Sequence, residues 1–276
     1  YQFNKDNRYY KDKQMLKRFL ENLKNKEKWI YQHNKNFQDF IKREDLKQFY
    51  LNPYDLSWSL DYPAFVKSRQ LANPLKSVLL PLENLYQPSF YANILQEDIP
   101  YNKKINNVVW RGSNSGYFLQ NTEKASRFKL VEKYRFHKKF NIGFSSIQYN
   151  KKLDLKYLAD KLSIKDQLKY KFIISVEGND FATNLSWIML SNSVPILPTC
   201  FVETWKCESA MTEYIHYIPV KRDFTDLQDK IKWALENNEK CLSIAFMSRM
   251  FIFQFFDLRK ERFLINKVIK KYNSIQ

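Results

Sequence analysis

A short polar loop, residues 177–184, stands between two segments whose patterns predict regular structure. The segment before it, 172–176, is an apolar run rich in branched residues, which is typical of a strand buried on both faces of a parallel sheet. The segment after it places apolar residues at helical spacing. In strand-loop-helix units of this kind, free backbone N–H groups and the positive end of the helix dipole attract phosphate. We therefore predict an anion-binding loop. Its candidate contacts are Glu177, Gly178, Asn179 and Asn184.

A second loop with phosphate-binding chemistry follows the short apolar strand predicted at 107–110. It begins with Arg111, Gly112 and Ser113, which supply a fixed cation and a hydroxyl that both suit a diphosphate. The chain has only four glycines, and three of them lie just after predicted strands. Glycine lets the backbone approach a ligand closely, so these positions carry information in a glycine-poor chain. The Arg-Gly-Ser motif alone is short enough to occur by chance in many proteins.

Arg127 lies in the helix predicted for residues 122–134, which follows the second loop. From that helix its guanidinium could reach back to the same phosphates. Arginines on helices are more often simply solvated, so the spacing is compatible with either role.

An acidic residue lies at the end of another predicted strand. Residues 56–60 alternate apolar and polar side chains, which is the mark of a half-buried strand, and Asp61, Tyr62 and Pro63 follow directly. An acid at a strand tip, held by a following proline, can act as a catalytic base in a cleft. Asp and Pro are also ordinary turn formers, and for Asp61 alone the turn is the more frequent explanation.

The elements that must position these residues alternate between strand and helix patterns. Strands are predicted at 107–110, 142–144, 172–176, 194–197 and 215–220. Helices are predicted at 122–134, 153–168, 185–189 and 226–237, and as one or two more within 244–269. This alternation is typical of a parallel α/β sheet and describes a nucleotide-binding Rossmann-like domain.

The first hundred residues have a different pattern. Residues 5–50 are rich in Lys, Asn, Glu and aromatics, and their apolar spacing predicts two amphipathic helices. A basic amphipathic helix can lie on an anionic membrane, although it more often packs on its own domain. A buried strand is predicted at 77–82, and the polar segment 83–105 resembles a connection between domains. We therefore expect one domain in 1–105 and a second in 106–276, whose C-terminal helices can pack back on the first.

Composition limits the classes of partner. The 276 residues are 44% hydrophobic and 17% aromatic, which is typical of a globular protein. The 46 Lys and Arg residues against 29 Asp and Glu residues give a formal charge of +17. This excess favours an acidic partner such as nucleic acid, an anionic membrane, a phosphorylated glycan or a nucleotide. A solvated surface in a lysine-rich proteome would produce the same count.

Cysteine and histidine usage argues against structural crosslinks. Cys200, Cys207 and Cys241 show no C-x-x-C pairing, and the three histidines are scattered along the chain. A disulfide framework, a structural zinc site or another metal cluster is therefore not expected, and a reducing compartment fits best. No apolar run approaches the length that spans a bilayer.

Taken in order along the chain, these motifs form a set that resembles glycosyltransferase family 90. That family includes eukaryotic protein O-glucosyltransferases, fungal capsule-associated enzymes and bacterial enzymes that modify lipopolysaccharide. The residues that carry the likeness are Asp61-Tyr62-Pro63, Trp110-Arg111-Gly112-Ser113, Lys169-Tyr170-Lys171, Glu177-Gly178-Asn179, Leu190-Ser191-Asn192-Ser193, Glu203-Thr204-Trp205 and His216-Tyr217-Ile218-Pro219-Val220. Each motif is modest, but their shared order across residues 56–225 is specific.

The resemblance implies two Rossmann-like domains that face each other across a cleft, the GT-B arrangement, with the nucleotide-sugar donor held mainly by the second. It also implies transfer with inversion at the anomeric carbon, without a metal or any cofactor besides the donor. By position, Asp61 matches the family's general base. Gly112 and Ser113 match donor-phosphate contacts, and Arg127 matches an arginine that pairs with the diphosphate. In such a displacement the carboxylate removes the acceptor proton while cations and N–H groups stabilise the departing diphosphate.

The chain departs from this pattern at Asn184, where the eukaryotic protein O-glucosyltransferases carry a second phosphate-binding arginine. An amide brings no charge, so Lys171 or Arg111 would have to help stabilise the diphosphate. The chain also ends without an endoplasmic-reticulum retention tail and is poor in cysteine. The resemblance therefore implies a bacterial member in the cytoplasm, or at the cytoplasmic face of the inner membrane, where a basic surface would hold it near anionic lipid.

The leading hypothesis is an inverting, metal-independent transfer of a hexose, glucose from UDP-glucose, to a hydroxyl of lipopolysaccharide, lipooligosaccharide or a related surface glycan. The expected partners are a nucleotide sugar, a glycan or glycolipid acceptor and an anionic membrane surface, and nucleic acid is not expected. Two alternatives remain. One is a basic nucleic-acid-binding protein, suggested by the charge and the interleaved aromatics but lacking a known binding module. The other is a catalytically silent scaffold that has kept the fold.

Overall fold

The computed structural model describes most of the chain from residue 94 onward and parts of the segment before it. The described residues are 51–52, 63–72, 74, 76–82, 94–116, 126–147 and 155–274. The helices predicted in 5–50, the strand predicted at 56–60 and Asp61 lie outside them. The chain forms two compact units. The first comprises Tyr1–Gln87, Glu203–Lys206 and Phe255–Gln276, and the second comprises Pro88–Val202 and Cys207–Gln254.

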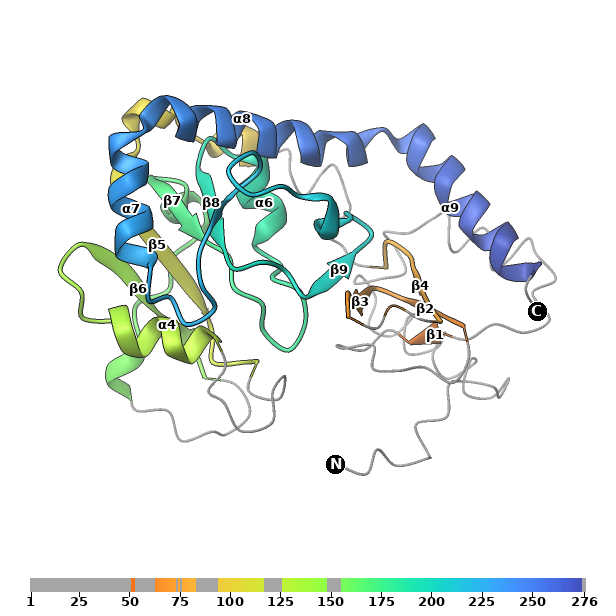
Figure 1. Cartoon of the computed structure of the whole chain (residues 1–276), viewed down its shortest axis with the longest axis horizontal. Coiled ribbons are helices and arrows are strands. Elements are labelled where there is room, and N and C mark those ends of the chain that lie inside the picture. The colour runs from red at the N-terminus through yellow and green to blue at the C-terminus, as the bar shows by residue number, and fades with distance from the viewer. Residues whose placement is uncertain are drawn as a thin grey trace. The chain divides into compact units, whose positions relative to one another are not determined.

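The second unit is built on a sheet of five parallel strands in the order β10-β8-β7-β5-β6. Figure 1 labels β8, β7, β5 and β6 of this sheet. Its strands are β5 (Ile105–Ser113), β6 (Phe140–Ser146), β7 (Tyr170–Ile174), β8 (Val194–Leu197) and β10 (Ile218–Pro219). Its helices are α4 (Ser126–Tyr134), α5 (Ile164–Gln167), α6 (Leu185–Leu190), α7 (Leu227–Glu236) and α8 (Asn238–Phe253). The predicted α/β class with a parallel sheet is confirmed, although β5 is longer and β10 shorter than their sequence patterns indicated.

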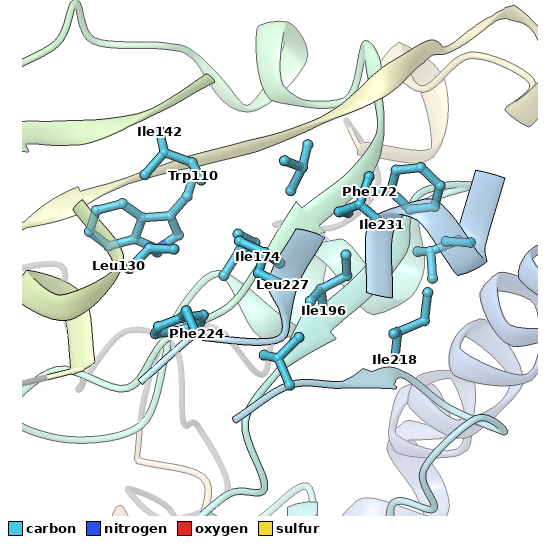
Figure 2. Packing of buried hydrophobic residues seen from close by; sticks show 14 of the residues in the cluster. Trp110, Leu130, Ile142, Phe172, Ile174, Ile196, Ile218, Phe224, Leu227 and Ile231 are labelled. Atoms are coloured by element: carbon cyan, nitrogen blue, oxygen red, sulfur yellow. The ribbon is translucent and has the colours of Figure 1, made fainter. Parts of the chain in front are cut away.

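The sheet is buried on both faces, as its branched apolar runs predict. Alternate residues of the strands, Trp110 and Ile174 among them, form one core cluster with side chains from α4, α7 and α8. Figure 2 shows Leu130 of α4 and Leu227 of α7 in this cluster together with those strand residues. On the opposite face Ile173 is also fully buried. Each buried side chain of this size contributes roughly 1.5–3 kcal/mol, so the core holds the strand ends in fixed positions.

The single helix predicted for 153–168 is wrong. The described part of this segment contains a short 3₁₀ turn and then the four-residue helix α5. Between them Leu158 forms a parallel bridge with Phe144 of β6. Ser163 then starts α5 because its side chain accepts a hydrogen bond from a backbone N–H of the first turn. The leucine stripe that suggested one helix therefore extends the edge of the sheet instead.

A buried ion pair lies within the segment 94–104, and hydrogen bonds from it join this segment to the rest of the second unit. The Lys104 ammonium donates to the Asp98 carboxylate, and the backbone N–H of Asn192 donates to the same carboxylate. Burial lowers the pKa of Lys104, and Asp98 opposes that shift. The compact units consequently divide between residues 87 and 88. The boundary at 105 that the sequence suggested stays a prediction about functional domains.

The first unit contains two small strand groups and the last helix. Its parallel three-stranded sheet has the order β1-β2-β4, and β3 pairs with β9. The elements are β1 (Leu51–Asn52), β2 (Ala64–Val66), β3 (Ser68–Gln70), β4 (Ser77–Leu79), β9 (Val202–Thr204) and α9 (Leu258–Asn273). The strand predicted at 77–82 is therefore present as β4, and the two helices allowed within 244–269 are α8 and α9.

The core of the first unit joins residues that are far apart in the sequence. Phe65 of β2 and Leu80 pack against Ile269 and Tyr272 of α9. The Tyr272 ring lies 4.2 Å from the Phe65 ring, and its hydroxyl donates to the Pro63 carbonyl at 2.8 Å. Helix α9 is thus an integral part of this unit. No single helix in the described part of the chain is long and apolar enough to cross a bilayer, although α8 and α9 pass that test as a bent pair.

The chain order of the five-stranded sheet reverses at β5. The next strand, β6, lies on one side of β5, whereas β7, β8 and β10 follow on the other. In open parallel sheets a ligand binds outside the carboxyl ends of the strands at such a reversal, because the loops leave in opposite directions there. The crevice selected by this rule lies where the chain leaves β5 and β7.

Candidate functional site

A pocket lies at the carboxyl edge of the second-unit sheet, at the point that the strand order selects. Its cavity volume is about 40 Å³, and the surrounding space of about 670 Å³ includes open solvent, so it is a small and open pocket. The walls come from segments that follow β5, β7, β8 and β10 and from the first residues of α4 and α6. The lining residues are Gly116, Ser126, Ser175, Val176, Glu177, Gly178, Phe181, Ala182, Leu185, Leu197, Pro198, Cys200, Phe201, Val202, Glu208 and Arg222.

An ion pair lies in the wall of this pocket. Arg222, shortly after β10, donates to one carboxylate oxygen of Glu177 at 3.3 Å. The backbone N–H groups of Phe201 and Val202 donate to the other oxygen at 2.9 and 3.1 Å. Burial raises the pKa of Glu177 to about 7, although Arg222 and the two N–H groups oppose the shift. The pocket therefore contains a carboxyl group that titrates near neutrality beside a fixed cation.

Arg127 of α4 fastens the two loops at the strand reversal to each other. Its Nε and Nη2 donate to the Val176 carbonyl at 3.1 and 2.9 Å. Its Nη1 donates to Ser115 Oγ at 2.7 Å and, at longer distances, to the carbonyl and hydroxyl of Ser113. Burial lowers the pKa of Arg127 to about 10, so the group stays charged at neutral pH. The predicted residue Arg127 is thus at the site, but its donors hold loop atoms.

The same two loops touch at Gly178. A β-carbon there would lie 2.7 Å from Ser115 Oγ and 2.8 Å from Arg127 Cζ, which no relaxed structure allows. Close approach without a side chain is the reason for this glycine. Next to it, Asn179 Oδ1 accepts a hydrogen bond from the Gly116 N–H at 2.8 Å. The structure therefore brings Gly178 and Asn179 to the site as parts of the loop framework.

Two predicted cations lie away from the pocket. Arg111 Nε donates to the Asp160 carbonyl at 2.8 Å, and its other nitrogens donate to the Trp110 carbonyl and to the carbonyl and side chain of Asn141. Lys171 lies at the start of β7, remote from the carboxyl end where the loops gather, and donates to Asn238 Oδ1 at 3.2 Å. The expectation that either would stabilise a ligand's phosphates is not supported by these positions.

The remaining predicted contacts have mainly structural partners. Asn184 accepts from Ser175 Oγ at 2.9 Å and donates to the Ile174 carbonyl at 3.0 Å, which joins α6 to β7. Gly112 leaves room for the Trp110 indole, since a β-carbon would lie 2.6 Å from that ring. Ser113 Oγ lies 3.1 Å from Ser115 Oγ at the rim of the loop pair. None of these three residues is among the described residues that line the pocket.

Comparison with known proteins decides the family. The family model for glycosyl transferase family 90 matches residues 91–276, which is more than half of the chain. The chain belongs to glycosyl transferase family 90. It is 31% identical over 222 residues to the O-glucosyltransferase LpsA of Dichelobacter nodosus, an alignment that covers 80% of this chain and 65% of LpsA. It is 28% identical over 155 residues to protein O-glucosyltransferase 2 of Danio rerio, which covers 55% of this chain and 29% of that protein.

A solved structure, that of Anabaena HepE in complex with UDP, shares 11% sequence identity with this family 90 chain. It covers 68% of this chain and 55% of HepE with a TM-score of 0.36, a likeness too low to decide the fold. The chain spans less than two thirds of the length of LpsA and of protein O-glucosyltransferase 2. The resemblance to family 90 noted from the sequence is confirmed.

Arg222 is the functional candidate of this family 90 chain that the sequence reasoning missed. It follows the strand predicted at 215–220 by two residues, so it stands at the carboxyl edge like the two loops that were chosen. The rule that selected Glu177 would have selected Arg222 if it had been applied to this strand. Among the described residues, no group of three or more His, Cys, Asp or Glu side chains could hold a metal ion.

Proposed function

We propose that the chain is a nucleotide-sugar-dependent glycosyltransferase whose donor binds in the pocket of the second unit. The observation that carries the proposal is the position of the pocket, at the carboxyl edge and strand reversal of a parallel sheet in a family 90 chain. The names of the relatives, O-glucosyltransferases, favour glucose as the sugar and UDP-glucose as its donor. The pocket offers the fixed cation and backbone framework that a diphosphate needs.

The proposed reaction is an inverting, metal-independent displacement. A carboxylate removes the proton of the acceptor hydroxyl, the hydroxyl oxygen bonds to the anomeric carbon, and the bond to the diphosphate breaks with both electrons leaving on UDP. We assign the base to Asp61, which the family resemblance selects. The positive charge that stabilises the departing diphosphate comes from arginine in place of a metal ion.

The proposed arrangement is of the GT-B kind, with the donor on the second unit and the acceptor side on the segment before residue 106. The proposed acceptor is a hydroxyl of lipopolysaccharide, lipooligosaccharide or a related surface glycan. A bacterial enzyme of this kind would act at the cytoplasmic face of the inner membrane. Helix α9 supports the membrane part of the proposal because its described exposed side chains include six cations and the apolar Phe263 and Leu264. Those cations are Arg259, Lys260, Arg262, Lys267, Lys270 and Lys271.

The experiment is a thermal-shift screen followed by a turnover assay. UDP and UDP-glucose should raise the melting temperature, since a ligand at about 100 times its Kd stabilises the folded state by about 2.7 kcal/mol. The active chain should then release UDP from UDP-glucose when a lipooligosaccharide extract is added, without a metal. Binding without any release would favour the silent scaffold, and salt-dependent binding of oligonucleotides in place of UDP would favour the nucleic-acid alternative.

The base assignment is tested by Asp61→Asn. This change should reduce UDP release by about 10²–10⁴-fold, the usual contribution of a general base, and leave the affinity for UDP within about twofold. Unreduced turnover in the variant would show that another group removes the proton.

A further inference from the structure

We infer that Arg222 is the residue that receives the donor's diphosphate, and that Glu177 occupies it as an internal counter-ion when no donor is bound. This inference rests on the proposed function and assigns its leaving-group chemistry to Arg222, which neither the family motif nor the sequence patterns selected, together with Glu177 of the predicted loop. It follows from which groups already accept hydrogen bonds from each arginine around the pocket.

The guanidinium groups of the other candidate cations already donate hydrogen bonds to protein atoms. Arg127 directs all three of its nitrogens to the carbonyls and hydroxyls of the loops after β5 and β7. Arg111 directs its three nitrogens to Asp160, Trp110 and Asn141 on the far side of the strand end. With four of its five N–H donors bonded, each has at most one left, so a bidentate contact with a diphosphate would break bonds that fix the backbone.

Arg222 is placed differently. Within the described part of the chain it donates to Glu177 at 3.3 Å and to the Thr199 carbonyl at 2.5 Å, which uses two of its five N–H donors. Its side chain is 36% exposed and lies over the Phe201 ring at 4.7 Å from the centroid. Both Arg222 and Phe201 line the pocket. A positioned, partly solvated guanidinium with donors to spare suits bidentate contact with phosphate oxygens.

Glu177 has the properties of an internal counter-ion for Arg222. Its side chain is only 12% exposed, and its contact with Arg222 is the longer of that arginine's two hydrogen bonds. A diphosphate entering the pocket would meet a negative carboxylate at close range, so binding should favour the protonated form of Glu177. Protonation also releases Arg222 from its ion pair. Diphosphate binding and protonation of Glu177 therefore favour each other, so donor binding is coupled to the uptake of one proton.

Electrostatic interactions with Arg222, Arg127 and Cys200 bear on the ionisation of Glu177. Arg222 and Arg127 favour its ionised form. The thiol of Cys200 stays neutral, because burial raises its pKa well above the usual value, and Glu208 acts in the same direction. Burial is the largest influence on Glu177 and holds its pKa at about 7. Ionisation of Glu177 above that pH should therefore weaken the binding of a diphosphate.

The test measures the affinity of UDP, inorganic pyrophosphate and uridine by calorimetry at several pH values. In Arg222→Gln, UDP and pyrophosphate should bind roughly 10- to 100-fold more weakly, because a charge-assisted hydrogen bond is lost, while uridine should be unaffected. Arg222→Lys should recover part of the loss. The matched control is Arg262→Gln, an exposed arginine of α9 in the first unit, which should bind all three probes like the unaltered chain.

The second variant tests the counter-ion. In the unaltered chain the affinity for UDP should fall between pH 7 and pH 8, at most roughly fivefold for one proton with a pKa of about 7. Glu177→Gln should bind UDP more tightly at pH 8 and lose this pH dependence. The terminal phosphate of UDP is largely ionised at pH 7, and its remaining ionisation would strengthen binding to Arg222, so it does not produce this fall in affinity.

The outcomes separate this inference from the proposed function. If the unaltered chain binds neither UDP nor UDP-glucose, the proposed function itself fails. If UDP binds well but Arg222→Gln weakens UDP and uridine alike, Arg222 only supports the loop, and the inference is overturned. A pH profile unchanged by Glu177→Gln would overturn the counter-ion role. Melting curves of each variant without ligand establish that the chains compared are folded.

Discussion

The two units of the molecule use positive charge in opposite ways. In the second unit, Arg222 lies in a pocket opposite Glu177, and its geometry is fixed by the Thr199 carbonyl and the Phe201 ring. In the first unit, the described side chains of α9 expose six cations, while its acidic residue, Glu261, is buried and accepts a hydrogen bond from Trp205. In the pocket the cation is paired with a carboxylate, whereas on α9 the exposed cations outnumber the helix's carboxylate.

Under the proposed function, the two arrangements divide the +17 charge between recognition of a small ligand and attraction to an anionic surface. A positioned arginine contributes through geometry, so its effect is confined to ligands with a phosphate in one place. Exposed lysines contribute additively through the field that they create, and salt screens them over about 10 Å. Three changes sharpen or break this contrast.

The largest effect is expected from neutralising α9. Replacing Lys267, Lys270 and Lys271 by Gln should weaken binding to anionic vesicles by about 3 kcal/mol, or roughly 100-fold, since each basic residue near such a surface contributes about 1 kcal/mol. Cosedimentation with phosphatidylglycerol vesicles, and with neutral phosphatidylcholine vesicles as the control, measures this. UDP affinity should stay within about twofold. Undiminished vesicle binding would show that α9 is an ordinary solvated face.

A smaller but still large effect is expected from Gly178→Ala in the pocket. The added methyl group would collide with Ser115 Oγ and Arg127 Cζ, so these side chains, whose hydrogen bonds join the two loops, must shift. We expect UDP to bind at least about tenfold more weakly and the chain to lose roughly 1–3 kcal/mol of stability, as in other overpacked sites. Urea unfolding and calorimetry measure the two quantities. Vesicle binding should not change, and Asn266→Ala on α9 provides the exposed control.

The third change tests a pH dependence of stability from Glu177. Its folded-state pKa of about 7 is higher than the ordinary value of 4.5, so the folded chain binds more protons than the unfolded chain between these values. The contribution of Glu177 to the free energy of unfolding is therefore present below pH 4.5 and is lost as the pH rises toward 7. In Glu177→Gln the free energy of unfolding should change less with pH. The free energy of unfolding is measured with urea at pH 5 and at pH 7.5. An equal change between these pH values in both proteins would contradict the raised pKa of Glu177.

The sequence predicts the sheet well because its strands are apolar runs that only a doubly covered parallel sheet can bury. The same reasoning failed for 153–168, where the leucine spacing fits a helix but Leu158 pairs with the edge strand. Helical periodicity describes one face of a segment and does not reveal a neighbouring strand that competes for its backbone.

For the site, position along the sheet was predictable, and the use of each side chain was not. Glu177, Gly178 and Arg127 do gather at the strand reversal, as their places after β7 and β5 suggested. Arg111 does not, because the alternation of side chains along β5 places it on the opposite face of the sheet from Trp110, where it bonds Asn141 of β6. Whether an arginine binds carbonyls or a ligand depends on neighbours that are distant in sequence, which a motif cannot show.

The first unit also constrains how the protein comes to be folded. Its core joins Phe65 and Leu80 to Ile269 and Tyr272, and the entire second unit lies between them in the sequence. During synthesis the N-terminal strands must wait for α9 to leave the ribosome before they can bury these side chains, whereas the second unit can close earlier. A chain that stops before α9 should therefore show an intact sheet of parallel strands beside an early segment that proteases cut readily.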